Sequence, residues 1–148
     1  MTDPFCWEAA PDHPGWMIWE LHDVDCFNNF VGPLLARREG DQAIVRLQPR
    51  PEHANYTGAI HGGLMMGFID CALFAGAAIL GAEGTSQGLT LECNVQFLAS
   101  GRLNVPLDAV IDVLRITGRF VFLRGLLVQE GANICNFSGM LRKADAKR

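Results

Sequence analysis

Two patterns of apolar residues divide the chain. Between residues 31 and 49, and again from residue 84 onward, apolar and polar residues alternate, which is typical of β-strands with one face on a core. The alternation is strictest over residues 90–97, where it predicts that Thr90 lies on the polar face, opposite the odd-numbered apolar residues. Residues 63–82 show no alternation, because nearly every position there is apolar.

Six stretches are predicted to be strands: 31–39, 42–49, 90–97, 105–117, 119–129 and 133–142. Short turn signals separate several neighbours, among them Gly40-Asp41, Gly118 and Glu130-Gly131. Connections this short cannot link parallel strands, so the sequence predicts an antiparallel sheet.

The apolar stretch 63–82 has one ionisable residue, Asp70, near its middle. Its length would suit a membrane span. A carboxylate at the bilayer centre costs about 2.5–3.5 kcal/mol, however. The stretch also contains four glycines and has no lysine or arginine near either end. Outside a membrane, a helix that is apolar on all sides must be surrounded by protein, so we predict a buried central helix.

These elements predict an α+β fold, in which a curved antiparallel sheet of five to six strands wraps around one long central apolar helix. Residues 31–148 would form this single domain. Residues 1–30 are expected to be an irregular N-terminal arm, interrupted by prolines and pinned to the domain by three tryptophans. The periodicity of residues 16–30 does not decide whether they are helical.

Composition excludes several classes of function. A net charge of −4 leaves no surplus of Lys and Arg for nucleic-acid binding. The five cysteines form no C-x-x-C pair, and the four histidines have no metal-binding spacing. The N-terminus has no signal-peptide pattern. We therefore expect a cytoplasmic protein with free thiols, no structural metal and no cofactor.

Gly58, Gly62 and Gly63 surround His61 where a loop meets the predicted helix. Unpaired N–H groups at a helix N-terminus attract negative charge, and glycine lets another molecule approach the backbone. This composition fits an oxyanion hole for an acyl carbonyl. A turn that needs glycine only for its geometry would look the same, so both interpretations stay open.

Two polar side chains could join this chemistry. Asp70 is a candidate general base for activating water, or else a carboxylate bonded locally for structure. Asn55, six residues before His61, could donate its amide to a carbonyl oxygen or fix a loop turn. Asp70 follows Gly62 by eight residues, roughly 12 Å along a helix. One helix cannot readily supply both roles to one substrate, so we predict a homodimer with two composite sites.

The same residues carry a family resemblance. In this order and at these spacings, they closely resemble the PaaI-like acyl-CoA thioesterases of the hotdog-fold superfamily, over about residues 30–143. The matching residues are Asn55, His61, Gly62, Gly63, Asp70 and Thr90. The resemblance implies a hydrolase that cleaves acyl-CoA to a free carboxylic acid and coenzyme A. It also implies a homo-oligomer, a homodimer or a homotetramer built from dimers, with active sites at the subunit interface.

The resemblance also implies a role for each residue of a catalytic set. Asp70 would act as base or nucleophile toward the thioester. The backbone N–H of Gly62 and the side chain of Asn55 would polarise the thioester carbonyl. His61 would shape the junction, and the hydroxyl of Thr90 would help to hold the attacking water.

Other residues are weaker candidates. Gly63 and Met66 could contact the substrate, although an apolar side chain at helical spacing more often belongs to a core. Cys71 adjoins Asp70 but points about 100° away from it around the helix, so core packing is its expected role. The candidates for the phosphates of coenzyme A are Arg102, Arg115, Arg119 and Arg124, among which the sequence does not select.

Two alternatives to hydrolysis stay open. A hotdog hydratase or dehydratase would share the fold, but it normally needs a His paired with an acid elsewhere, and that pattern is not apparent. A non-catalytic acyl-CoA binding module would keep the pocket without turnover. The complete set of Asn, His, Gly and Asp disfavours this second alternative.

Overall fold

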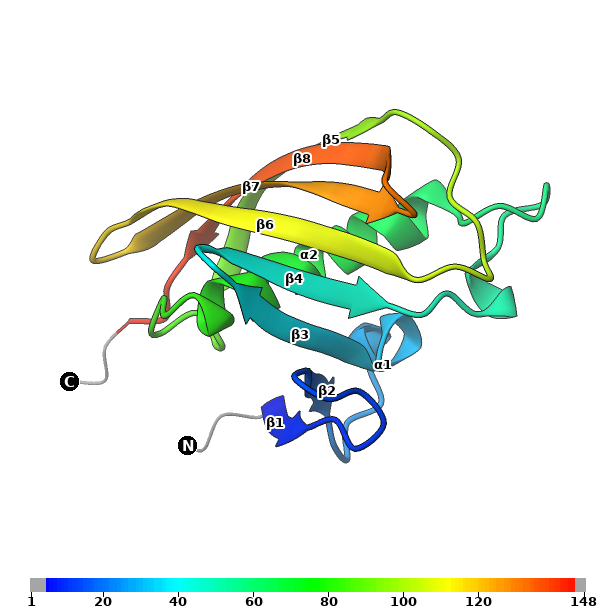
Figure 1. Ribbon diagram of the computed structural model, residues 1–148. Helices are drawn as coiled ribbons and strands as arrows, with labels where there is room; N and C mark the ends of the chain where they lie inside the picture. The colour runs from blue at the N-terminus through cyan, green and yellow to red at the C-terminus, as the bar shows by residue number, and fades with distance from the viewer. Residues whose placement is uncertain (1–4, 146–148) are drawn as a thin grey trace.

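The computed structural model describes residues 5–145, which form one antiparallel sheet, two α-helices and a short 3-10 helix. The elements in chain order are β1 (Phe5–Ala9), β2 (Met17–Leu21), α1 (Phe27–Val31), β3 (Leu34–Glu39), β4 (Gln42–Leu47), the 3-10 helix (Pro51–His53), α2 (Gly62–Ile79), β5 (Leu89–Phe97), β6 (Leu107–Ile116), β7 (Phe120–Gln129) and β8 (Ala132–Arg142). The sheet order is β1-β2-β3-β4-β6-β7-β8-β5 (Figure 1).

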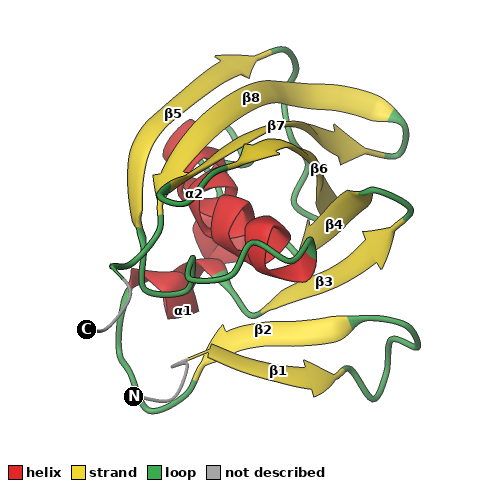
Figure 2. Cartoon of the chain, turned by 90° about the vertical axis from the view of Figure 1, so that its left-hand side faces the viewer, coloured by secondary structure: helices red, strands yellow, loops and turns green. Residues whose placement is uncertain are grey.

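The sheet curves around α2, while α1 lies against the part of α2 that the sheet leaves open (Figure 2). This arrangement confirms the predicted antiparallel sheet wrapped around one long apolar helix. The predicted number of five to six strands is wrong, because the sheet has eight. The two additional strands, β1 and β2, come from the stretch expected to be an irregular arm, and β2 pairs directly with β3.

The tryptophans of the N-terminal stretch explain this integration. Trp7 and Trp19 are partners in the β1–β2 register, and their ring centroids lie 6.3 Å apart. Trp19 is only 5% exposed and belongs to the main core. Trp16 lies against the guanidinium groups of Arg37 and Arg46, whose central carbons are 4.9 and 4.7 Å from its ring. The hairpin is thus packed as part of the sheet.

Helix α2 is the core element predicted from its apolar sequence. Within residues 5–145 it is the one helix long and apolar enough to cross a membrane by length and composition. The sheet packs around it, and 56% of that stretch is buried inside the protein. Gly76 allows close packing, since a Cβ atom placed there would lie 2.9 Å from Cδ1 of Ile111. Gly81, with φ of +85°, follows the helix in the left-handed conformation common after a helix end.

Strand β5 lies at one edge of the sheet, because the chain crosses over through α2 after β4 and returns beyond β8. It pairs with β8 along one side, and no other described strand pairs with its opposite side. Large apolar side chains on and just after β5 are exposed: Leu89, Leu91, Phe97 and Leu98. This edge therefore presents unpaired backbone groups together with apolar surface.

Candidate active site

The first turn of α2 leaves backbone donors free, and the N–H of Gly62 is one of them. His61 caps the helix, and its Nδ1 accepts the backbone N–H of Gly63 at 2.8 Å. The carbonyl of His61 accepts the N–H of Met65. Within residues 5–145 no group accepts a hydrogen bond from the N–H of Gly62. That N–H remains available to an incoming oxygen at the positive end of the helix, whereas the N–H of Gly63 is already donated.

Asn55 is fixed by its carbonyl oxygen. Its Oδ1 accepts the backbone N–H of Thr57 at 2.9 Å, the hydroxyl of Thr57 at 2.7 Å and the N–H of Ala59 at 3.1 Å. These three bonds orient the side-chain amide, and its Nδ2 donates to no other described residue. Asn55 therefore shapes the loop and still presents an oriented N–H donor. The structure thus shows the loop role, one of the two alternatives that the sequence left open, and the amide stays available for the other.

Phe97 was missed by sequence reasoning. A Cβ atom placed on Gly62 would lie 3.5 Å from Cε1 of Phe97, so the ring packs against this glycine at the start of α2. The ring is 50% exposed, although alternation predicts only an apolar residue facing the core. Its exposure at the end of an edge strand, which alternation cannot reveal, makes it a candidate wall of the site.

Asp70 is partly buried between α2 and β5. Its Oδ1 accepts a hydrogen bond of 2.5 Å from the hydroxyl of Thr90. This contact corrects the predicted placement of Thr90 on the polar face. Thr90 pairs with Leu141 and Glu92 with Met140, so the strand contains a β-bulge. The extra residue turns Thr90 toward α2, and bulges often redirect a side chain in this way beside a functional site.

The thiols near Asp70 are poor nucleophiles. The pKa of Cys71 is raised to about 12, mainly by burial and then by the nearby Asp70 and Cys26. Burial also raises the pKa of Cys93, and the Asp70 carboxylate adds to that effect. Both thiols thus stay protonated at neutral pH, whereas attack on a thioester needs a thiolate. Asp70 is the group beside these thiols that can accept a proton.

The candidate residues form two separate groups. The junction cluster, Asn55, His61 and Gly62, lies at the start of α2, and the carboxylate cluster, Asp70 and Thr90, lies near its middle. The separation along the helix is about 12 Å. Within one chain the structure places Asp70 and Thr90 in contact and Asn55 in the loop that leads to His61 and Gly62, but it does not join the two clusters.

The structure distinguishes the candidate arginines. Arg124 forms an ion pair with Asp112, its sheet partner on β6. Arg115 and Arg119 lie at the β6–β7 turn, whereas the other end of β6 lies beside the end of β4 that leads to the junction cluster. Arg102 lies in the loop that bonds to the residue before His61, because the carbonyl of Gly101 accepts the N–H of Ile60 at 2.9 Å.

Arg102 also lines a surface hollow of about 450 Å³, together with residues 57–59 and 100–105. Its guanidinium is paired with Glu130 and is 61% exposed. As for metals, no group of three or more His, Cys, Asp or Glu side chains within residues 5–145 could hold an ion.

Known structures share this fold. A PaaI phenylacetic acid degradation protein from Thermus thermophilus, solved as a mutant, is 21% identical, with a TM-score of 0.66 over 81% of this chain and 100% of that chain. A hypothetical thioesterase from Streptococcus pneumoniae, solved with coenzyme A, is 17% identical, with a TM-score of 0.65 over 76% and 90% of the two chains. A Streptococcus mutans protein bound to acetyl-CoA is 16% identical, with a TM-score of 0.68 over 87% and 99%.

The structural similarities show the hotdog fold alone, whereas a comparison with protein-family models identifies a family. No curated protein matches the chain. The family model described as the thioesterase superfamily matches residues 57–135, more than half of the 148 residues. The matched stretch contains most of the junction cluster and the whole carboxylate cluster. The chain therefore belongs to the thioesterase superfamily.

Proposed function

We propose that this protein is an acyl-CoA thioesterase that hydrolyses its substrate to a free carboxylic acid and coenzyme A. One observation carries the proposal: the same helix has an unpaired N–H at Gly62 and a carboxylate, Asp70, held by a hydroxyl. Stabilising an acyl carbonyl oxygen needs a hydrogen-bond donor such as the free N–H, and activating an attacking water needs a base such as the carboxylate. The solved relatives that hold coenzyme A or acetyl-CoA support the substrate class.

The proposed reaction is direct attack by water. Asp70 accepts a proton from the water while the water oxygen forms a bond to the thioester carbon. The carbonyl oxygen becomes negative and is stabilised by the N–H of Gly62 and the amide of Asn55. The tetrahedral species then collapses and the carbon–sulfur bond breaks. Asp70 gives the proton to the departing sulfur, so coenzyme A leaves as the thiol and the carboxylate is restored. Thr90 holds the Asp70 carboxylate in place during these steps.

We propose that each site is composed of two chains. If the free edges of two β5 strands pair antiparallel about an axis between Cys93 and Asn94, Thr90 of one chain lies opposite the partner subunit's Phe97. Thr90 marks the carboxylate cluster, and Phe97 marks the junction cluster. This register would close the gap of about 12 Å that separates the clusters in one chain. The exposed apolar side chains of β5 would be covered in the same step.

Arg102 is the arginine that we assign to the phosphates of coenzyme A. It lies in the loop bonded to Ile60, next to the junction cluster, where the thioester carbonyl is proposed to bind. Its ion pair with Glu130 is exposed, and exposed pairs contribute only about 0–1 kcal/mol. A phosphate can therefore replace Glu130 at little cost.

The test is thiol release from a panel of acyl-CoAs, with the wild type and Asp70→Ala. The wild type should release coenzyme A, and the variant should not. An absorbance change of an enoyl-CoA without thiol release would identify a hydratase instead. Binding without either reaction would identify a non-catalytic module.

Asn55→Asp separates loop structure from catalysis. Aspartate keeps the oxygen that Thr57 and Ala59 need but replaces the amide donor with an oxygen. We expect kcat to fall by about 10²–10³-fold, the cost of one oxyanion donor, with little loss of stability. Mixing inactive Asp70→Ala with inactive Asn55→Ala chains should restore part of the activity in hybrid dimers. No recovery after verified subunit exchange would contradict the composite site.

A further inference from the structure

The short helix α1 packs against α2 beside the carboxylate cluster. Gly67 permits the contact, because a Cβ atom placed on it would lie 2.6 Å from Cε1 of Phe27. Nδ2 of the next residue, Asn28, donates to Sγ of Cys71 at 3.6 Å. Gly67 lies three residues before Asp70, so the ring of Phe27 stands about one helical turn from the carboxylate.

Apolar surface is exposed on this side of Asp70. The side chain of Phe27 is 55% exposed, although it packs on Gly67. Met66, four residues before Asp70 and hence on the same side of α2, is 45% exposed. Apolar side chains that remain exposed together beside a reactive group are typical of a ligand site. Phe27 and Met66 thus provide exposed apolar surface on the side of α2 that carries Asp70.

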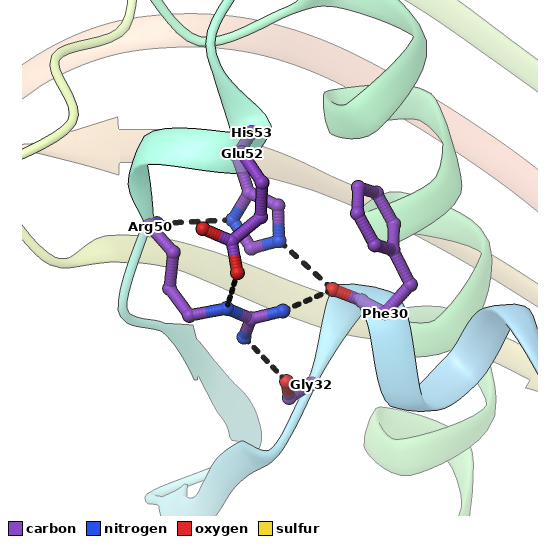
Figure 3. Close-up of polar contacts among 5 residues, drawn as sticks. All are labelled: Phe30, Gly32, Arg50, Glu52 and His53. Atoms are coloured by element: carbon purple, nitrogen blue, oxygen red, sulfur yellow. Dashed lines mark hydrogen bonds and ion pairs between the residues drawn. The ribbon is translucent and has the colours of Figure 1, made fainter. Parts of the chain in front are cut away.

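Helix α1 is held in place by a network of polar contacts (Figure 3). Arg50 donates to the carbonyl of Gly32 at 2.6 Å and also to that of Phe30. His53, only 1% exposed, accepts the N–H of Arg50 at Nδ1, 3.1 Å away. Its Nε2 must then carry the proton that bonds to the carbonyl of Phe30 at 2.9 Å. Glu52 pairs with Arg50 at 2.9 Å, and this hydrogen bond lowers the pKa of Glu52.

This network makes α1 a fixed wall. A helix of five residues has almost no stability of its own, so its position depends on such contacts. Three donors converge on carbonyls at the end of α1, and the ring of Phe30 packs edge-on against His53 with centroids 5.3 Å apart. The position of Phe27, one turn earlier in α1, is fixed by the same contacts.

We propose that Phe27 limits the size of the acyl group that reaches Asp70. The coenzyme A moiety is polar and highly charged, whereas the acyl group is apolar and is expected to lie along Met66 and end against the Phe27 ring. The proposal rests on the thioesterase activity proposed above, with Asp70 as its base. It makes Phe27 a specificity-determining residue and assigns the protein to acyl groups short enough to stop at that ring.

The test compares kcat/KM across straight-chain acyl-CoAs from acetyl to dodecanoyl, together with benzoyl- and phenylacetyl-CoA. Phe27→Ala should raise kcat/KM for groups longer than the wild-type optimum by at least about tenfold relative to that optimum. Phe27→Trp should shift the optimum to smaller groups. Phe27→Leu keeps an apolar side chain on Gly67 and should give an intermediate profile. It replaces the alanine variant in the test if that variant is unstable. Leu114→Ala removes an equally exposed side chain from the end of β6 and should leave the profile unchanged.

The outcomes separate this inference from the proposed function. An active wild type whose profile is the same in the Phe27 variants would overturn the size limit and leave the thioesterase standing. A changed oligomeric state with an unchanged profile would also overturn it and would indicate that Phe27 packs against a second copy. A wild type that releases no thiol from any substrate would overturn both proposals.

Discussion

The hydroxyl of Thr90 donates a hydrogen bond to Oδ1 of Asp70, which joins the edge strand β5 to the middle of α2. The bond fixes one carboxylate oxygen and leaves Oδ2 for a water molecule. We expect Thr90→Val, which keeps the shape but removes the hydroxyl, to lower kcat by about 10- to 100-fold. A hydrogen bond to a charged group contributes about 1.5–3 kcal/mol. Steady-state kinetics should show little change in KM.

Thr90→Ser is the matched control, because it restores a hydroxyl at the same position. It should retain most of the wild-type kcat. Equal loss in the serine and valine variants would contradict the role of the hydroxyl and would point to packing by the threonine methyl group.

The same contact marks a limit of sequence reasoning. Alternation over residues 90–97 correctly predicts a strand but assigns Thr90 to the wrong face. One extra residue between Thr90 and Glu92 reverses the assignment, and no glycine or proline in the strand signals it. The family resemblance still makes Thr90 a candidate, because a resemblance depends on residue identity and not on which face a side chain occupies.

Features with local causes could be predicted from the sequence, whereas features that depend on distant residues could not. The central helix follows from uniform apolarity around Asp70, which the sequence displays directly. Strands β1 and β2 have five residues each, and their pairing depends on Trp19 reaching the core. The position of Phe27 depends on bonds from Arg50, a residue 23 positions further along the chain, to the end of α1. Contacts between such distant residues leave no periodic signal.

His61 gives a prediction about stability. Its Nδ1 accepts the N–H of Gly63 at the start of α2. We expect His61→Ala to lower the free energy of unfolding by about 0.5–2 kcal/mol, the usual cost of removing an N-cap side chain. His61→Asn supplies another acceptor and should recover most of the loss. Urea denaturation followed by circular dichroism measures both variants. Equal stability of wild type and His61→Ala would show that the cap contributes nothing.

The raised pKa of Cys71 gives a prediction about how the free energy of unfolding changes at alkaline pH. Its pKa is raised to about 12, mainly by burial and then by Asp70 and Cys26. The pKa of the cysteine thiol in an unfolded chain is about 8.5. Because the folded pKa is the higher one, the stabilisation is complete below the unfolded pKa and is lost as pH rises toward the folded pKa. The free energy of unfolding should therefore fall above about pH 9.

Cys71→Ala isolates this contribution. Lysine, tyrosine and the other cysteine groups titrate in both proteins, so they cancel in the difference. We expect the free energy of unfolding of the variant to fall less steeply between about pH 8.5 and 10.5 than that of the wild type. Urea denaturation at several pH values gives both slopes. Parallel curves would contradict the raised pKa, whatever the variant costs at neutral pH.

Close packing at Gly125 gives a prediction about the stability of the part of the sheet that supports the site. A Cβ atom placed there would overlap the carbonyl oxygen of Val110 and lie 2.5 Å from Cζ of Phe137. Phe137 pairs with Gly125 on one side and with Val95 of β5 on the other. We expect Gly125→Ala to destabilise the fold by about 1–3 kcal/mol, because neither a backbone oxygen nor a buried ring can move freely. Gly118→Ala, with no other atom within 4 Å of the added carbon, is the control and should be neutral within about 0.5 kcal/mol.

Thermal or urea denaturation that ranks the two variants equally would mean that β6 and β8 adjust to the added methyl group. The position of β5, and with it the contact between Thr90 and Asp70, would then not depend on close packing at Gly125.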